Sequence, residues 1–159
     1  MLSIKPSDVD YLEAGEGSLV ILVHPSVSGA RQWRKLIDVL ADSFHVKAVN
    51  AFGCARTPAW TASRPQILAD QAALIEAIVP DGIKNIALVG HSFGGSVATR
   101  ASAKLGERVA RLALPEPNPF NLLRDSGRNE AFAEVAKLRD IIKAHGAKGS
   151  WSVAAQPDN

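Results

Sequence analysis

The chain has 159 residues, enough for one domain with a real core, and its 47% hydrophobic and 21% charged residues are typical of an ordinary globular protein. Its 18 basic and 16 acidic residues are scattered and give a net charge of +2, which argues against a nucleic-acid or membrane-surface partner. The single cysteine, Cys54, excludes an intramolecular disulfide and a cysteine metal cluster, and without a secretory signal or a membrane-length apolar run we expect a soluble cytoplasmic protein.

Strand-length apolar runs alternate with helical patterns along the chain. A weakly alternating segment over 9–14 ends at a Gly-rich turn, and we expect it to form a hairpin with the continuous apolar run 19–23. Three further apolar runs are predicted as buried strands, at 44–49, 86–89 and 109–114. Helical spacing predicts helices over about 31–41, 68–79 and 94–106.

Strands that alternate with helices of this length predict an α/β fold with a parallel sheet and right-handed crossovers. After 114 the pattern changes, because three prolines between 115 and 119 interrupt it. A helix is predicted over 130–145, and the residues from 146 to 159 are expected to fray. The apolar stripe of that helix consists of Phe132, Val135, Leu138 and Ile142.

The strongest chemical signal is the motif Gly90-His91-Ser92-Phe93-Gly94, which lies between a predicted strand and a predicted helix. A sharp strand-to-helix turn of this pattern exposes a serine hydroxyl as a nucleophile, and its glycines keep side chains out of the crowded turn. The alternative is a Gly-rich turn that only ends a strand. The strand–turn–helix context favours a nucleophile elbow, with Ser92 as the nucleophile and Gly90 and Gly94 as supporting residues.

A second signal, His24-Pro25-Ser26, follows the predicted strand 19–23. This turn resembles the one that, in hydrolases with such an elbow, supplies one backbone N–H of the oxyanion hole. The resemblance implies that Phe93, the residue after the nucleophile, supplies the other. Because proline has no N–H, the first donor is expected from Ser26 or a neighbour. His24 is interpreted as a scaffold that holds the turn by hydrogen bonds, and not as a base.

With these motifs, the segment from Leu19 to about Phe120 resembles the amino-terminal half of cap-bearing α/β-hydrolases, which include esterases, epoxide hydrolases and haloalkane dehalogenases. The last two groups carry an aspartate at the elbow, so Ser92 makes an esterase, lipase or carbon–carbon hydrolase the nearer resemblance. The resemblance implies a hydrolase core over 1–114 and the start of a helical cap over 115–159. It also implies hydrolysis of an ester or related acyl bond in a small apolar substrate, without cofactor or metal.

The family's catalytic histidine has no counterpart in this chain. Members of the family are longer, and after the cap two further strands carry the usual acid and, last, the histidine. Glu116, after the predicted strand 109–114, stands where some members carry their acid, although a salt-bridged or hinge glutamate would look the same. We therefore expect a truncated or degenerate product with little or no activity. The histidines, none of which occupies the family position, are His24, His45, His91 and His145.

Two alternatives from other classes stay open. One is a non-catalytic protein that holds a small apolar ligand in the elbow pocket, and tight binding without turnover would identify it. The other is a fragment whose missing strands come from a partner chain or a second copy, and concentration-dependent activity would identify it. An unpaired sheet edge at 109–114 also predicts self-association.

Overall fold

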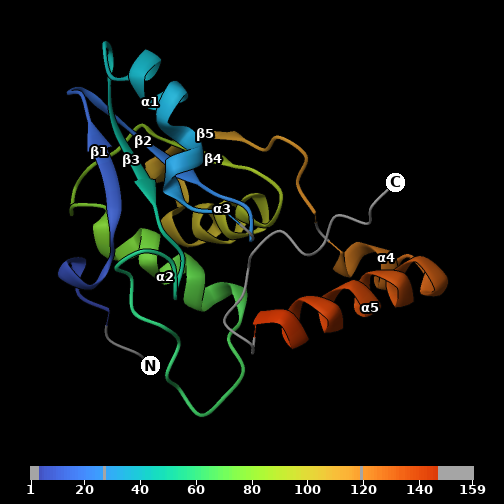
Figure 1. The fold of residues 1–159 in the computed structure, drawn as a ribbon. Coiled ribbons are helices and arrows are strands. Elements are labelled where there is room, and N and C mark those ends of the chain that lie inside the picture. Colours follow the sequence, from blue (N-terminus) through green and yellow to red (C-terminus); the bar gives the residue numbers. More distant parts are fainter. Residues whose placement is uncertain (1–3, 27, 119, 147–159) are drawn as a thin grey trace. The chain divides into compact units, whose positions relative to one another are not determined.

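The computed structural model describes residues 4–26, 28–118 and 120–146. The chain divides into two units, Met1–Asn118 and Pro119–Asn159. The first unit holds a sheet with its helices, and the second contains two helices (Figure 1). The residues singled out for chemistry all precede Pro119 and therefore lie in the first unit.

A five-stranded sheet forms the centre of the first unit, in the order β1-β3-β2-β4-β5 (Figure 1). Its strands are β1 Tyr11–Ala14, β2 Ser18–Val23, β3 Phe44–Val49, β4 Ile86–Gly90 and β5 Val109–Ala113. The strands from β2 to β5 are parallel to their neighbours, while β1 is antiparallel to β3. The predicted α/β fold is confirmed, and β1 makes the sheet mixed rather than purely parallel.

Helices cover both faces of this sheet. Successive residues of a strand point to opposite faces, and β2 shows this clearly. Leu19, Ile21 and Val23 join a core with α2 and α3, whereas Val20 and Leu22 join a second core with α1. The helices are α1 Arg34–Leu40, α2 Leu68–Ile78 and α3 Phe93–Leu105, with short 3-10 helices η1 Pro6–Asp8, η2 Ala30–Trp33 and η3 Gly106–Arg108.

The predicted hairpin between the first two strands is wrong. β1 pairs with β3, with Tyr11 opposite Val49, and β3 lies between β1 and β2. The link from β1 to β2 passes over the start of β3, where Gly15 has φ +73° and a Cβ on it would overlap the carbonyl oxygen of Phe44. Because the link carries a glycine at this close approach, β3 can take the place beside β2.

The fifth strand forms as predicted but is not buried. β5 lies at the edge of the sheet and pairs with β4. Its residues from Ala110 to Ala113 are exposed, and the Leu112 side chain is 39% exposed. A parallel strand is buried only when it has cover on both faces and neighbours on both sides. Within the described residues β5 has a single neighbour, so the prediction of a buried strand is wrong.

The second unit contains α4 Asn121–Asp125 and α5 Asn129–Gly146. The helix predicted over 130–145 is confirmed as α5, whereas α4 lies outside the predicted elements. Gly127, at φ +74°, joins them and lets the Arg128 N–H donate to the Leu123 carbonyl at 2.8 Å. A glycine in the left-handed conformation is a common way to end a helix.

Two residues of the predicted apolar stripe of α5, Phe132 and Val135, are half-buried. The side chains of Leu138 and Ile142 and the residues 147–159 lie outside the described part of the chain. Across the described ranges, no helix combines the length and apolar character that crossing a bilayer requires.

Candidate active site

The carboxyl ends of β2 and β4 meet where the strand order reverses. The chain passes from β2 to β3 on one side, and the next strand, β4, lies on the other side of β2. In open α/β sheets, ligands bind in the crevice at such a reversal. Val23 and Gly90, at the ends of these two strands, are paired. The turn that begins at His24 and the turn that contains Ser92 therefore start side by side.

Ser92 forms a sharp turn between β4 and α3. It is the N-cap residue of α3, with φ 53° and ψ −119°. A positive φ is strained for a residue with a side chain and costs on the order of 1–3 kcal/mol. Neighbouring bonds hold it, since the Ser92 N–H donates to the Pro115 carbonyl at 3.2 Å and the Gly95 N–H donates to the Ser92 carbonyl at 2.9 Å. The predicted strand-to-helix turn at Ser92 is present.

The motif glycines allow the start of α3 to lie directly on the strand ends. A Cβ on Gly94 would overlap the carbonyl oxygen of Val23, and a Cβ on Gly90 would overlap that of Gly94. A Cβ on Gly95 would lie 3.1 Å from the Pro117 ring. Both predicted supporting glycines are therefore sites of close backbone approach, where any side chain would push the turn away from β2.

The His24 ring is buried and holds two backbone segments. The Ala51 N–H donates to Nε2 at 3.1 Å, so Nε2 must be unprotonated. Nδ1 then carries the hydrogen and donates to the Pro25 carbonyl at 2.7 Å. Burial lowers the pKa of His24 below its ordinary value, which favours this neutral ring. Both nitrogens are occupied, as the interpretation of His24 as a scaffold requires.

The two expected oxyanion donors belong to the turns that follow β2 and β4. Phe93 is the first residue of α3, so its N–H has no acceptor within the helix. Ser26 is exposed and lies in the turn where the Ser28 N–H donates to the Pro25 carbonyl at 3.2 Å. Phe93 and His24 also line one cavity of about 10 Å³, which is too small for a substrate.

Glu116 lies on the surface after β5. Its side chain is 91% exposed, and its Oε2 lies 3.8 Å from Nε2 of His91. Its backbone has φ 44°, an uncommon value for a glutamate. The structure thus brings Glu116 to His91, the residue before Ser92.

The remaining histidines do not reach the serine in the described part of the chain. His45 lies opposite Leu19 at the amino end of the sheet and contacts Glu13 Oε1 at 2.7 Å. The side chain of His145 lies outside the described residues. Among the described residues, none forms a hydrogen bond with the Ser92 hydroxyl, and no group of three or more His, Cys, Asp or Glu could hold a metal ion.

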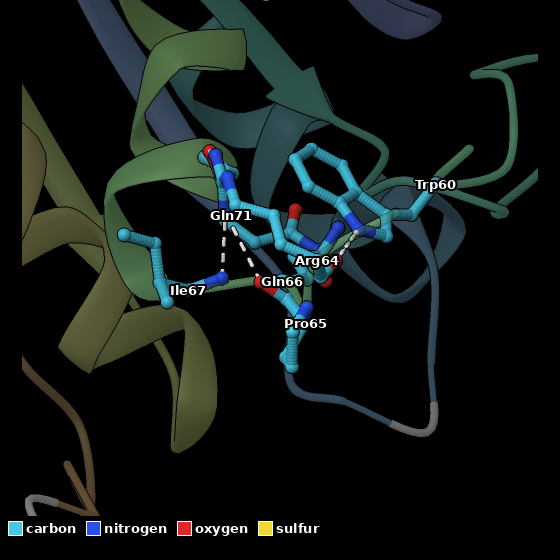
Figure 2. Close-up of polar contacts among 7 residues, drawn as sticks. Trp60, Arg64, Pro65, Gln66, Ile67 and Gln71 are labelled. Atoms are coloured by element: carbon cyan, nitrogen blue, oxygen red, sulfur yellow. Dashed lines mark hydrogen bonds and ion pairs between the residues drawn. The ribbon is translucent and has the colours of Figure 1, made fainter. Parts of the chain in front are cut away.

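A buried polar residue on α2 holds the loop that follows β3, and the sequence analysis did not assign it to the site. Gln71, on α2, accepts from the Phe52 N–H at 3.4 Å. It also donates to Gln66 Oε1 at 2.9 Å (Figure 2). In the same loop, Trp60 Nε1 donates to the Arg64 carbonyl at 2.8 Å. A polar side chain on the apolar stripe of a predicted helix is the signal that indicates such a residue.

Comparison with known proteins gives a consistent set of matches. The model of the alpha/beta hydrolase fold family matches residues 18–139. The chain is 31% identical over 142 residues to 2-hydroxymuconate semialdehyde hydrolase of Pseudomonas sp. (strain CF600), which covers 82% of this chain and 49% of that protein. It is 33% identical over 143 residues to the lipase LipV of Mycobacterium tuberculosis, covering 87% of this chain and 53% of that protein. The chain therefore spans about half the length of these relatives.

Solved structures show the same likeness. A probable hydrolytic enzyme from Pseudomonas aeruginosa PAO1 superposes with a TM-score of 0.60 at 27% identity. The match covers 70% of this chain and 42% of that structure.

Proposed function

The chain belongs to the α/β hydrolase fold family, and on that premise we propose that it hydrolyses an ester or related acyl bond through Ser92. The observation that carries this proposal is the strained turn at Ser92, which lies at the strand-order reversal beside the His24 turn. A residue is held at a positive φ only when the surrounding structure demands it, and such strain gathers at functional sites. Relatives named as hydrolases and a lipase support the same reaction type.

In this proposal the Ser92 hydroxyl attacks the carbonyl carbon of a small apolar ester. The carbonyl oxygen becomes an oxyanion, which the N–H groups of Phe93 and Ser26 hold. Each such donor is worth on the order of 3 kcal/mol in the transition state. The oxyanion then collapses and the ester C–O bond breaks. The alcohol leaves with the proton lost from Ser92, which solvent water carries, and a second water hydrolyses the acyl-serine to a carboxylic acid and free Ser92.

Among the described residues, none accepts the proton of the Ser92 hydroxyl. A serine is a weak nucleophile without a base, and His24 has both ring nitrogens occupied. Loss of the base from an intact triad costs on the order of a million-fold in turnover, while the hole and binding alone retain roughly a thousandfold over water. We therefore expect barely detectable turnover from this chain. Glu116 stays a candidate acid, to be tested through its neighbour His91.

Hydrolysis of p-nitrophenyl acetate tests this proposal. The wild type should show a slow rate above the buffer, Ser92→Ala should lower it at least threefold, and a fluorophosphonate probe should label Ser92 slowly or not at all. Ser102→Ala is the control and should keep the wild-type rate, because the half-buried Ser102 hydroxyl donates to the Thr99 carbonyl on the same helix. Equal rates for the wild type and Ser92→Ala would contradict the proposal. Fast, Ser92-dependent turnover would show that a base has been missed, with His145 the first to be tested.

A groove of about 910 Å³ over β2, β4 and β5 favours a second candidate role, a fragment completed by a partner chain. Val20, Ala87 and Ala113 line it, one from each of β2, β4 and β5. In this role, specific activity would rise with protein concentration, whereas the isolated serine site predicts a constant value.

A further inference from the structure

The turn between β2 and η2 is tied to the end of β3 by one side chain. Asn50 directly follows β3 and is 5% exposed. Its Oδ1 accepts from the Ala30 N–H at 2.9 Å, and its Nδ2 donates to Asp10 Oδ2 at 2.7 Å. The three residues lie 20 and 40 positions apart in the sequence, so the amide joins segments that share no local connection.

The orientation of this amide is dictated by its partners. A backbone N–H can only donate and an ionised carboxylate can only accept, so the oxygen must face Ala30 and the nitrogen must face Asp10. Burial raises the pKa of Asp10, but hydrogen bonds from Arg56 and Asn50 outweigh burial and lower it below its ordinary value. Asp10 is held in turn, since Arg56 Nε donates to its Oδ1 at 2.8 Å and its own N–H donates to Thr57 Oγ1 at 3.0 Å.

Asn50 and its neighbour Ala51 hold the two ends of one turn. The His24 ring, at the start of the turn, accepts from the Ala51 N–H and donates to the Pro25 carbonyl. Asn50 holds the far end at Ala30, and a Cβ on Gly29 would lie 3.2 Å from its Oδ1. The expected oxyanion donor, Ser26, lies between these two anchors.

The geometry points to Asn50 as a positioning residue that sets the Ser26 N–H for the oxyanion by fixing Ala30 against Asp10. This inference rests on the proposed function. It assigns the distant pair Asp10 and Asn50 to the site, although neither side chain reaches Ser92.

The test uses Asn50→Asp and a swapped pair, Asp10→Asn with Asn50→Asp. In Asn50→Asp, two carboxylates face each other where the Asn50 amide donated to the Asp10 carboxylate. In the swapped pair, an amide at position 10 can again donate to a carboxylate at position 50. We measure backbone amide hydrogen exchange over residues 24–30, and kcat and KM for p-nitrophenyl acetate. Asn85→Asp, an exposed site, is the control for charge.

For Asn50→Asp we expect amide exchange over 24–30 to quicken at least tenfold. The part of kcat that Ser92→Ala abolishes should fall about tenfold or more, with KM changed less than twofold, since loss of an oxyanion donor lowers kcat by 100-fold or more. The swapped pair should return both readouts to within threefold of the wild type. The inference is overturned if Asn50→Asp exchanges its amides at the wild-type rate, or if the swapped pair fails to restore that rate. It is also overturned if the swapped pair restores amide exchange but not kcat. If Ser92→Ala leaves turnover unchanged, the proposed function fails instead, and amide exchange alone decides whether Asn50 sets the turn.

Discussion

His24 and Ser92 have opposite surroundings, although each follows the end of a neighbouring strand. The His24 ring is buried with both nitrogens bonded to backbone. The Ser92 hydroxyl has no hydrogen-bond partner among the described residues. A polar group that is fully bonded serves the structure, whereas one that is held in a strained turn and left unbonded is available for chemistry.

The buried His24 ring makes the free energy of unfolding depend on pH. Its pKa is lowered by burial in the folded chain, while the unfolded chain titrates near the ordinary value of 6.5. As pH falls below 6.5, the unfolded chain takes up a proton that the folded chain does not, so stability falls; above 6.5 this contribution is fully present. One such proton changes stability by at most about 1.4 kcal/mol per pH unit.

Urea unfolding between pH 5 and pH 8 measures this effect. His24→Gln cannot titrate, so its stability should fall less steeply below pH 6.5 than that of the wild type. Ser102→Ala should keep the wild-type slope. Equal slopes for the wild type and His24→Gln would contradict this, because they would mean that His24 takes up its proton below pH 6.5 as readily in the folded chain as in the unfolded chain.

At the scale of elements, the contact of α3 with the end of β2 is made through backbone. Gly94 lies against the Val23 carbonyl, and helix and strand meet without an intervening side chain. This contact is what allows the Ser92 turn to start beside the His24 turn. Both glycines of the elbow are thus required by packing as well as by the turn itself.

Gly94→Ala should lower the free energy of unfolding by about 1–2 kcal/mol. Added volume at a closed contact costs about 1–3 kcal/mol, and the gain in helix propensity, about 1 kcal/mol, offsets only part of this cost. Arg100→Ala, on the exposed side of α3, should stay within about 0.5 kcal/mol of the wild type. Urea denaturation of the three proteins measures both, and a stable Gly94→Ala would show that α3 stands further from β2.

At the scale of the whole molecule, the outer edge of β5 is the most consequential feature. A strand edge presents unpaired N–H and C=O groups, which favour pairing with another chain. In the described residues β5 pairs with β4 alone, and its Ala113 lines the open groove. An apolar face beside a free edge is a surface on which two copies can associate.

We expect the sedimentation coefficient to rise with protein concentration. Ala113→Lys places a charge in the groove beside the free edge and should return the protein to a concentration-independent monomer. Val39→Lys is the matched control, because Val39 is 70% exposed on α1 and receives the same added charge. A wild type that stays monomeric at high concentration would contradict this prediction, as would equal behaviour of the two lysine variants.

The sequence by itself determined the features that depend on neighbouring residues. The apolar runs, the helical spacing of α3 and the motif around Ser92 are local, so the strands, the α/β class and the elbow turn were predictable. That the His24 ring has hydrogen-bond partners was also predictable, since a buried histidine after a strand needs them for its ring nitrogens.

Only the tertiary structure decided which strand pairs with β1, how exposed β5 is, and what Asn50 holds. β1 lies beside β3 because a glycine link passes over the start of that strand, and β5 is exposed because nothing described pairs with its outer edge. Asn50 joins Asp10 to Ala30 across 40 and 20 positions. The spacing of apolar residues indicates whether a segment is a helix or a strand and which of its faces is apolar. Strand pairing, burial and side-chain hydrogen bonds depend instead on contacts between segments far apart in the chain.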